Sequence, residues 1–182
     1  MALPFLTAWR AARGREERAR RYVRTLMNEP TDAEVADLAA ATDHDEDHAR
    51  WELRYARRAL GVLVAERDAL DDRTSSDVVA ALDLAHRADS RIAADRRAVS
   101  QQQLNERLHA YRVAMSDRAG GDTPAVRVGR VLVTFARGTA RPELLTLASN
   151  IAEGITVECN AALRAIYGEA SLPENLKPSE IG

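Results

Sequence analysis

The sequence predicts an all-α protein, a bundle of five to six helices with one or two long helices that can project from the core. Alanine, leucine, arginine and glutamate, which favour helices, are abundant. Apolar residues recur at intervals of three and four, and no segment alternates as a strand does. Hydrophobic residues make up 46% of the chain but aromatic residues only 4%, so aliphatic side chains and alanine must fill most of the core.

Composition and charge divide the chain into three parts. Residues 1–30 form a basic amphipathic arm, residues 31–168 the helical bundle domain, and residues 169–182 an extended or flexible tail. The total of 182 residues fits one domain, for which about 100–200 residues are usual. The tail contains two prolines and little periodicity, so no helix is expected there.

The arm is expected to form a helix over residues 5–27. Its apolar stripe comprises Phe5, Trp9, Ala12, Ala19, Val23 and Leu26. Glu16 interrupts this stripe, and the sequence Asn28-Glu29-Pro30 ends the helix. The helix is therefore amphipathic, but weakly so.

A short second helix over residues 32–41 is expected to begin with a capping box. Thr31 and Glu34 stand three residues apart, so the side chain of each can accept a hydrogen bond from the backbone amide of the other. This reciprocal bonding satisfies amides that the first turn of a helix leaves unpaired.

A long third helix is expected over residues 45–71. A second capping box, Asp43 with Glu46, opens it, and Asp45, Glu46 and Asp47 in its first turn complement the helix dipole. Its apolar residues follow spacings of three and four, so we expect this helix to pack along one stripe.

The next helical region, residues 75–118, contains neither glycine nor proline. As one helix it would be about 63 Å long at 1.5 Å per residue, whereas a globule of this size is about 40 Å across. The apolar stripe restarts out of phase after Val99, and residues 100–103 could cap a new helix. Two alternatives stay open, a helix that projects and a helix that breaks.

The last two helices, over residues 124–137 and 142–168, are expected to form the heart of the core. Each begins with a proline at its first position, and Thr123 caps the first of them. Both are rich in valine, leucine and isoleucine. Cys159, the one cysteine of the chain, lies on an apolar face and is interpreted as a small core residue, which excludes an intramolecular disulfide.

Charge is distributed unevenly along the chain. The net charge is −2, so no overall field attracts nucleic acid or an anionic membrane. Residues 1–28 nevertheless carry seven arginines and two glutamates, and residues 29–48 carry eight acids with no lysine or arginine. These segments either neutralise each other, within the fold or between subunits, or the basic arm binds a partner.

We therefore expect a non-enzymatic helical interaction or oligomerisation module that acts through protein–protein contacts and needs no cofactor. The sequence contains no Gly-rich phosphate loop, nucleophile elbow, kinase signature or His-Glu-x-x-His motif, and no catalytic residue is assigned. The residues assigned to the partner surface are Phe5, Trp9, Arg10, Arg13, Arg20, Arg21 and Arg24.

A metal-binding bundle, including a ferritin-like metalloenzyme, is the alternative. His44, His48 and Glu52 stand four residues apart on one helix face and could hold zinc. Glu106 and His109 match one Glu-x-x-His pair of the ferritin-like di-iron bundles, although the helix over 124–137 supplies no carboxylate to complete such a site.

Residues 34–38 and 55–60 faintly resemble the helix-turn-helix of sigma-factor DNA-binding regions. The segment that would enter the major groove, residues 42–48, is acidic and would repel phosphates, so no specific DNA binding is expected. No 18-residue apolar run occurs, and the two glutamates of the arm argue against contact with a membrane surface. A cytoplasmic protein is expected, and 25 arginines beside the single Lys177 suggest a bacterial source rich in G and C.

Overall fold

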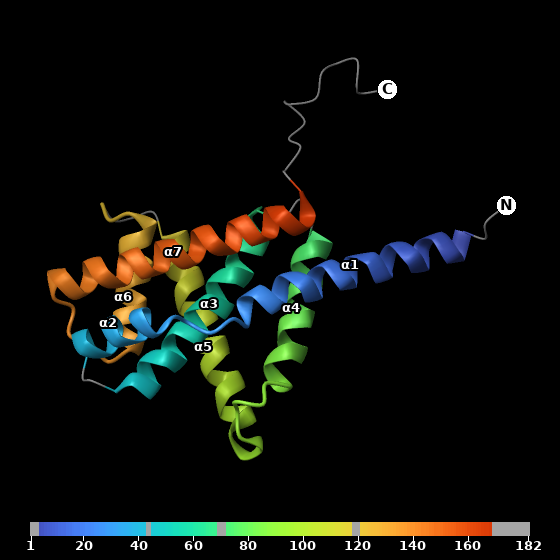
Figure 1. The fold of residues 1–182 in the computed structure, drawn as a ribbon. Coiled ribbons are helices and arrows are strands. Elements are labelled where there is room, and N and C mark those ends of the chain that lie inside the picture. Colours follow the sequence, from blue (N-terminus) through green and yellow to red (C-terminus); the bar gives the residue numbers. More distant parts are fainter. Residues whose placement is uncertain (1–3, 43–44, 69–71, 118–120, 169–182) are drawn as a thin grey trace.

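The structure is a computed structural model that describes residues 4–42, 45–68, 72–117 and 121–168, with side chains from residue 9 onward. Within these ranges the chain forms seven α-helices, one 3-10 helix and no strand, which confirms the all-α prediction (Figure 1). The elements are α1 (Pro4–Leu26), α2 (Asp32–Thr42), α3 (Glu46–Asp68), α4 (Asp72–Arg87), η1 (Ala94–Arg96), α5 (Arg97–Ser116), α6 (Pro124–Phe135) and α7 (Pro142–Tyr167). The predicted tail over 169–182 lies outside the described residues.

The centre of the bundle is α3, which packs against α2, α4, α5 and α7. Every residue from 52 to 65 is buried, on all sides of the helix. The prediction that this helix packs along one stripe is therefore wrong, whereas the last two helices contribute to the core as predicted. α6 and α7 do pack together, and they cover α3 and α5 from one side.

Four charged residues of α3 are buried with the apolar ones, and each has a partner of opposite charge. Glu52 binds Arg107, Arg54 binds Glu29, Arg57 binds Glu158, and Arg58 binds Asp89. A buried charge without a partner would lose its hydration and gain nothing in return, whereas a paired one recovers much of that loss. Pairing with residues far along the chain thus allows the polar face of α3 to lie inside.

Hydrogen bonds at the helix ends confirm part of the predicted capping. Thr31 and Glu34 accept from each other's backbone amides at 3.2 and 2.7 Å, and the side chain of Thr123 accepts from the amide of Val126 at 3.3 Å. At the start of α3 the cap is Asp45, whose Oδ1 accepts from the amide of His48 at 3.0 Å. Asp43, predicted as the cap, lies outside the described residues.

Of the two alternatives left open for residues 75–118, the structure shows the break, which lies between α4 and α5. The break falls at residues 88–96, before the Ser100 segment in which the sequence suggested a restart. Asp89 causes it, because its carboxylate accepts from the backbone amide and the side chain of Arg91 and from Arg58 of α3. These bonds stabilise a turn in place of another helical turn. No helix within the described ranges combines the length and apolar character needed to cross a membrane.

α6 and α7 approach closely because Gly129 faces Ser149. A Cβ atom added at Gly129 would lie 2.5 Å from Ser149 Oγ and 2.7 and 2.8 Å from its backbone N and Cα. Cys159 is buried on the α3 side of α7, as the sequence predicts, and burial raises the pKa of its thiol to about 11.

Two glycine substitutions should therefore have opposite effects. Replacing Gly129→Ala forces α6 away from α7 and should lower the free energy of unfolding by about 1–3 kcal/mol. Gly154, also in α7, has no atom within 4 Å of an added Cβ, so Gly154→Ala should raise it by about 0.5–1 kcal/mol through helix propensity. Urea unfolding followed by circular dichroism measures both, and effects of the same sign would contradict the close packing.

Candidate functional site

The carboxyl-terminal half of α1 is anchored in the bundle. Ala19, Tyr22, Val23 and Leu26 are buried, and the hydroxyl of Tyr22 donates to the carbonyl of Gly61 in α3 at 2.9 Å. The amino-terminal end of α1 extends past α4 and α7 (Figure 1). The amino-terminal half of α1 is therefore presented to solvent, while the carboxyl-terminal half of the same helix is fixed in the bundle.

Trp9 lies on this projecting part and is 50% exposed. The guanidinium carbon of Arg13, one turn further along, lies 5.0 Å from the centre of the Trp9 ring. This cation–π contact holds the indole against the helix and limits the freedom that it would lose on binding. Exposed tryptophan and arginine are the residue types that contribute most at protein interfaces.

The structure places the predicted partner residues together on the outer side of α1. Arg10, Arg13, Arg20, Arg21 and Arg24 are all exposed. Trp9, Arg13, Arg20 and Arg24 are spaced so that they follow one side of the helix. Arg20 pairs with Glu16 at 3.6 Å, as the i, i+4 order predicts. The side chain of Phe5 lies outside the described residues.

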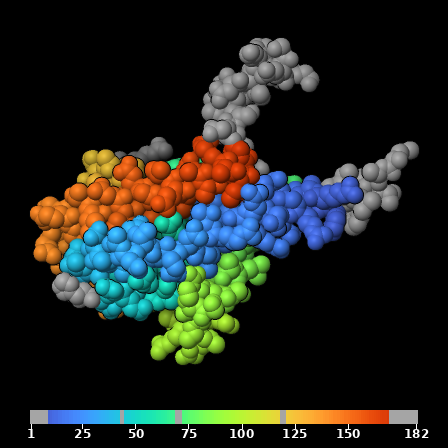
Figure 2. Space-filling view, in the orientation of Figure 1, coloured from blue at the N-terminus to red at the C-terminus, as the bar shows by residue number. Residues whose placement is uncertain are grey.

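An acidic surface, defined here as Asp32, Asp37, Asp45, Glu46 and Asp47, covers α2 and the start of α3. All five residues are exposed, and Asp32 accepts from Arg50 at 3.1 Å. Among the described residues, no ion pair joins an arginine of the arm to an acid of residues 29–48. Figure 2 shows α2 and the projecting end of α1 at opposite ends of the molecule.

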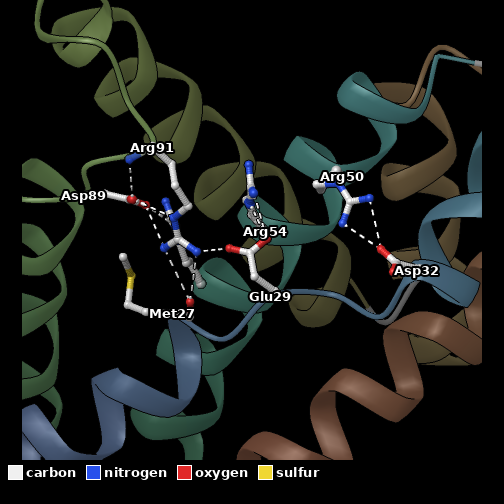
Figure 3. A network of polar contacts seen from close by, with 8 residues as sticks. Met27, Glu29, Asp32, Arg50, Arg54, Asp89 and Arg91 are labelled. Carbon is white, nitrogen blue, oxygen red and sulfur yellow. Dashed lines mark hydrogen bonds and ion pairs between the residues drawn. The ribbon is translucent and has the colours of Figure 1, made fainter.

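The base of the arm is held by a network of polar contacts (Figure 3). Glu29 accepts from Arg54 at 2.7 and 3.0 Å and is also paired with Arg91. Arg91 in turn contacts the carbonyl of Met27 at 3.4 Å and binds Asp89 at 2.6 and 2.9 Å. Because these residues come from α3, the α4–α5 connection and the end of α1, the network fixes the direction in which the arm leaves the body.

The residues predicted to hold a metal are engaged in other contacts where the structure describes them. His48 Nε2 lies 3.0 Å from the carbonyl of Phe135, and both oxygens of Glu52 accept from Arg107, at 2.5 and 2.9 Å. Glu106 and His109 are exposed on α5, and His44 lies outside the described residues. No group of three or more His, Cys, Asp or Glu in the described ranges could hold a metal ion. The zinc or iron alternative stays a prediction.

The polar cluster around Arg58 was not predicted from the sequence. Arg58 is 1% exposed, and its guanidinium donates to Asp89 at 2.6 Å and to Nδ1 of His86 at 2.7 Å. One signal was present, since His86 continues the apolar stripe of α4 four residues after Leu82. A histidine at a core position of a helix indicates a buried polar contact.

His86 is held in its neutral form. Burial and then the positive charge of Arg58 lower the pKa of His86 from 6.5 to about 4. The geometry agrees, because an arginine can only donate and Nδ1 must therefore carry a lone pair.

Three comparisons complete the description of the site. No model of a protein family, no curated protein and no solved structure matches the chain.

The neutral state of His86 predicts a pH dependence of stability. Between pH 6.5 and about 4 the unfolded chain binds a proton at His86 that the folded protein excludes. Stability that is fully present above pH 6.5 is therefore lost on acidification, by about 3 kcal/mol at pH 4. Urea unfolding at several pH values should show this loss, and His86→Asn should remove it from the pH profile. Equal profiles for the two proteins would contradict a buried neutral imidazole.

Proposed function

We propose that the protein is a non-enzymatic helical module that self-associates, with the arm of one copy docked on the acidic surface of another. One observation carries the proposal. Exposed arginines on the projecting helix and exposed acids on the body have complementary charge, yet they form no pairs with each other within the described chain.

A second copy is the occupant that fits these features best. Each chain supplies both a basic helix and an acidic surface, at opposite ends of the molecule (Figure 2). Such an interface joins different surfaces of the two copies. If each arm docks on the other copy's acidic surface, a closed two-fold dimer results, and if only one arm docks, the contact repeats into longer assemblies.

Trp9 provides apolar surface at the proposed contact, which the charged residues do not supply. Charge complementarity mainly guides approach and orientation, whereas exposed ion pairs contribute only about 0–1 kcal/mol each. A half-exposed indole already held by Arg13 can bury its ring at the centre of the contact with little loss of side-chain freedom. Trp9→Ala should therefore weaken association even at an ionic strength that screens the arginines.

Exchanging charges between the two surfaces tests the proposal. Arg10→Glu with Arg13→Glu on the arm, or Asp37→Arg with Asp47→Arg on the acidic surface, should each raise the dissociation constant about tenfold at low salt, equivalent to about 1.4 kcal/mol. An equimolar mixture of the two variants should restore association, because the arm of one and the acidic surface of the other are again complementary. Sedimentation velocity over a range of protein and salt concentrations measures this.

A double variant of exposed arginines outside the arm, Arg73→Glu with Arg97→Glu, provides the control for net charge. It should associate like the unaltered protein. A protein that is monomeric at every concentration, or arm and body variants that associate as the unaltered protein does, would rule out self-association by this route.

A further inference from the structure

A pocket between α3, α5 and the α4–α5 connection is unrelated to the arm. It has a volume of about 320 Å³, near the lower end of the range of about 300–1,000 Å³ in which small-molecule sites fall. Trp51 and Tyr55 of α3 form one wall, Ile92 and Val99 contribute apolar surface, and Arg96 and Gln103 supply polar groups. We call it the aromatic pocket.

A chain of hydrogen bonds from the buried Arg58 ends in this pocket. Arg58 donates to His86 Nδ1, and His86 Nε2 lies 3.1 Å from Ser100 Oγ. Ser100 Oγ lies 2.9 Å from the hydroxyl of Tyr55, which lies 2.9 Å from Oε1 of Gln103. The chain thus runs through four side chains that carry no net charge.

The direction of every bond in the chain follows from its two ends. Since an arginine cannot accept, Nδ1 of His86 accepts and Nε2 carries the proton, which it donates to Ser100. At the other end, the hydroxyl of Tyr55 donates its one hydrogen to Oε1 of Gln103, so Tyr55 accepts from Ser100. With Oε1 on Tyr55, the two N–H groups of Gln103 Nε2 are left to donate elsewhere.

The aromatic pocket thus offers a ligand both a hydrogen-bond donor and a cation. Nε2 of Gln103 has no acceptor among the described residues. The nearest acid to Arg96 is Asp95, at 3.7 Å, and both side chains are more than 70% exposed, so this guanidinium can turn toward a ligand. Arg91 also lines the pocket, although its guanidinium is already paired with the carboxylates of Asp89 and Glu29.

A neighbouring pocket limits where an anion can lie. It shares Trp51, Tyr55 and Gln103 with the aromatic pocket but is also lined by more acids than arginines, namely Asp45, Asp47, Glu52 and Glu106 against Arg107 and Arg137. These carboxylates repel a negative group, whereas Arg91 and Arg96 attract one on the other side. Of the two rings, that of Trp51 offers a surface to a planar group, because Trp51 is partly exposed, with Arg54 4.4 Å from the centre of its ring, whereas Tyr55 is buried with Arg107 over its ring.

We propose that the aromatic pocket binds a small aromatic carboxylate, with its ring against Trp51 and Val99 and its carboxylate on Gln103 Nε2 and Arg96. The proposal does not depend on self-association, because none of these residues belongs to the arm or to the acidic surface.

Calorimetric titration of the full chain with benzoate, phenylacetate and indole-3-acetate tests the site. At least one of these acids should bind, and at least tenfold more tightly than its uncharged amide and than acetate. Gln103→Glu is the decisive variant, because a carboxylate still accepts from Tyr55 but replaces the Nε2 donor with a negative oxygen. It should keep the helical circular dichroism spectrum and weaken binding of the acid at least tenfold.

Arg96→Gln should reduce the preference for the acid over its amide, while Arg97→Gln, an exposed neighbour that does not line the pocket, should leave it unchanged. Absence of binding by all three acids, equal affinity for acid and amide, or binding that Gln103→Glu leaves intact would each overturn the proposal.

Discussion

The buried guanidinium of Arg58 is the constraint on which the rest of the structure depends. It lies inside the bundle with 1% of its surface exposed and can remain charged there only because Asp89 and His86 accept its hydrogen bonds. Burial lowers the pKa of Arg58, and the carboxylate of Asp89 opposes that shift. These bonds tie α3 to the end of α4 and to the turn that follows.

Both regions for which we propose a binding role adjoin this cluster. Asp89 also binds Arg91, which contacts Glu29 and the carbonyl of Met27 and so fixes the base of the arm (Figure 3). On the other side of the cluster, His86 donates to Ser100, and Ser100 donates to Tyr55 at the aromatic pocket. In the proposed roles, a rigid base would present Trp9 of the arm in one direction, and the oriented hydrogen-bond chain would leave the pocket with a donor for an acceptor ligand.

Local sequence signals predicted what local interactions determine. The ends of α1, α2, α6 and α7 fall within two residues of their predicted bounds because caps and prolines act over one helical turn. The burial of α3 was not predictable in this way. Charged residues such as Arg58 and Glu52 are expected on an exposed helix face, and their partners of opposite charge lie 31 and 55 residues away along the chain. A break within residues 75–118 was one of two alternatives, but its position at Asp89 was not predictable for the same reason. The exposure of the arm's arginines was predictable from their charge. The aromatic pocket was not predictable, because it combines residues of two helices and a turn that are far apart in the sequence.

A double-mutant cycle on Arg58 and Asp89 tests this account most directly. The free energy of unfolding in urea at neutral pH is measured for Arg58→Met, for Asp89→Asn and for both together. Each single change leaves a buried polar group without its partner and should cost about 3–5 kcal/mol, while the double change should cost less than the sum by about 1–3 kcal/mol. Additive losses of less than about 1 kcal/mol each, as at an exposed pair, would contradict a fold organised around this buried guanidinium.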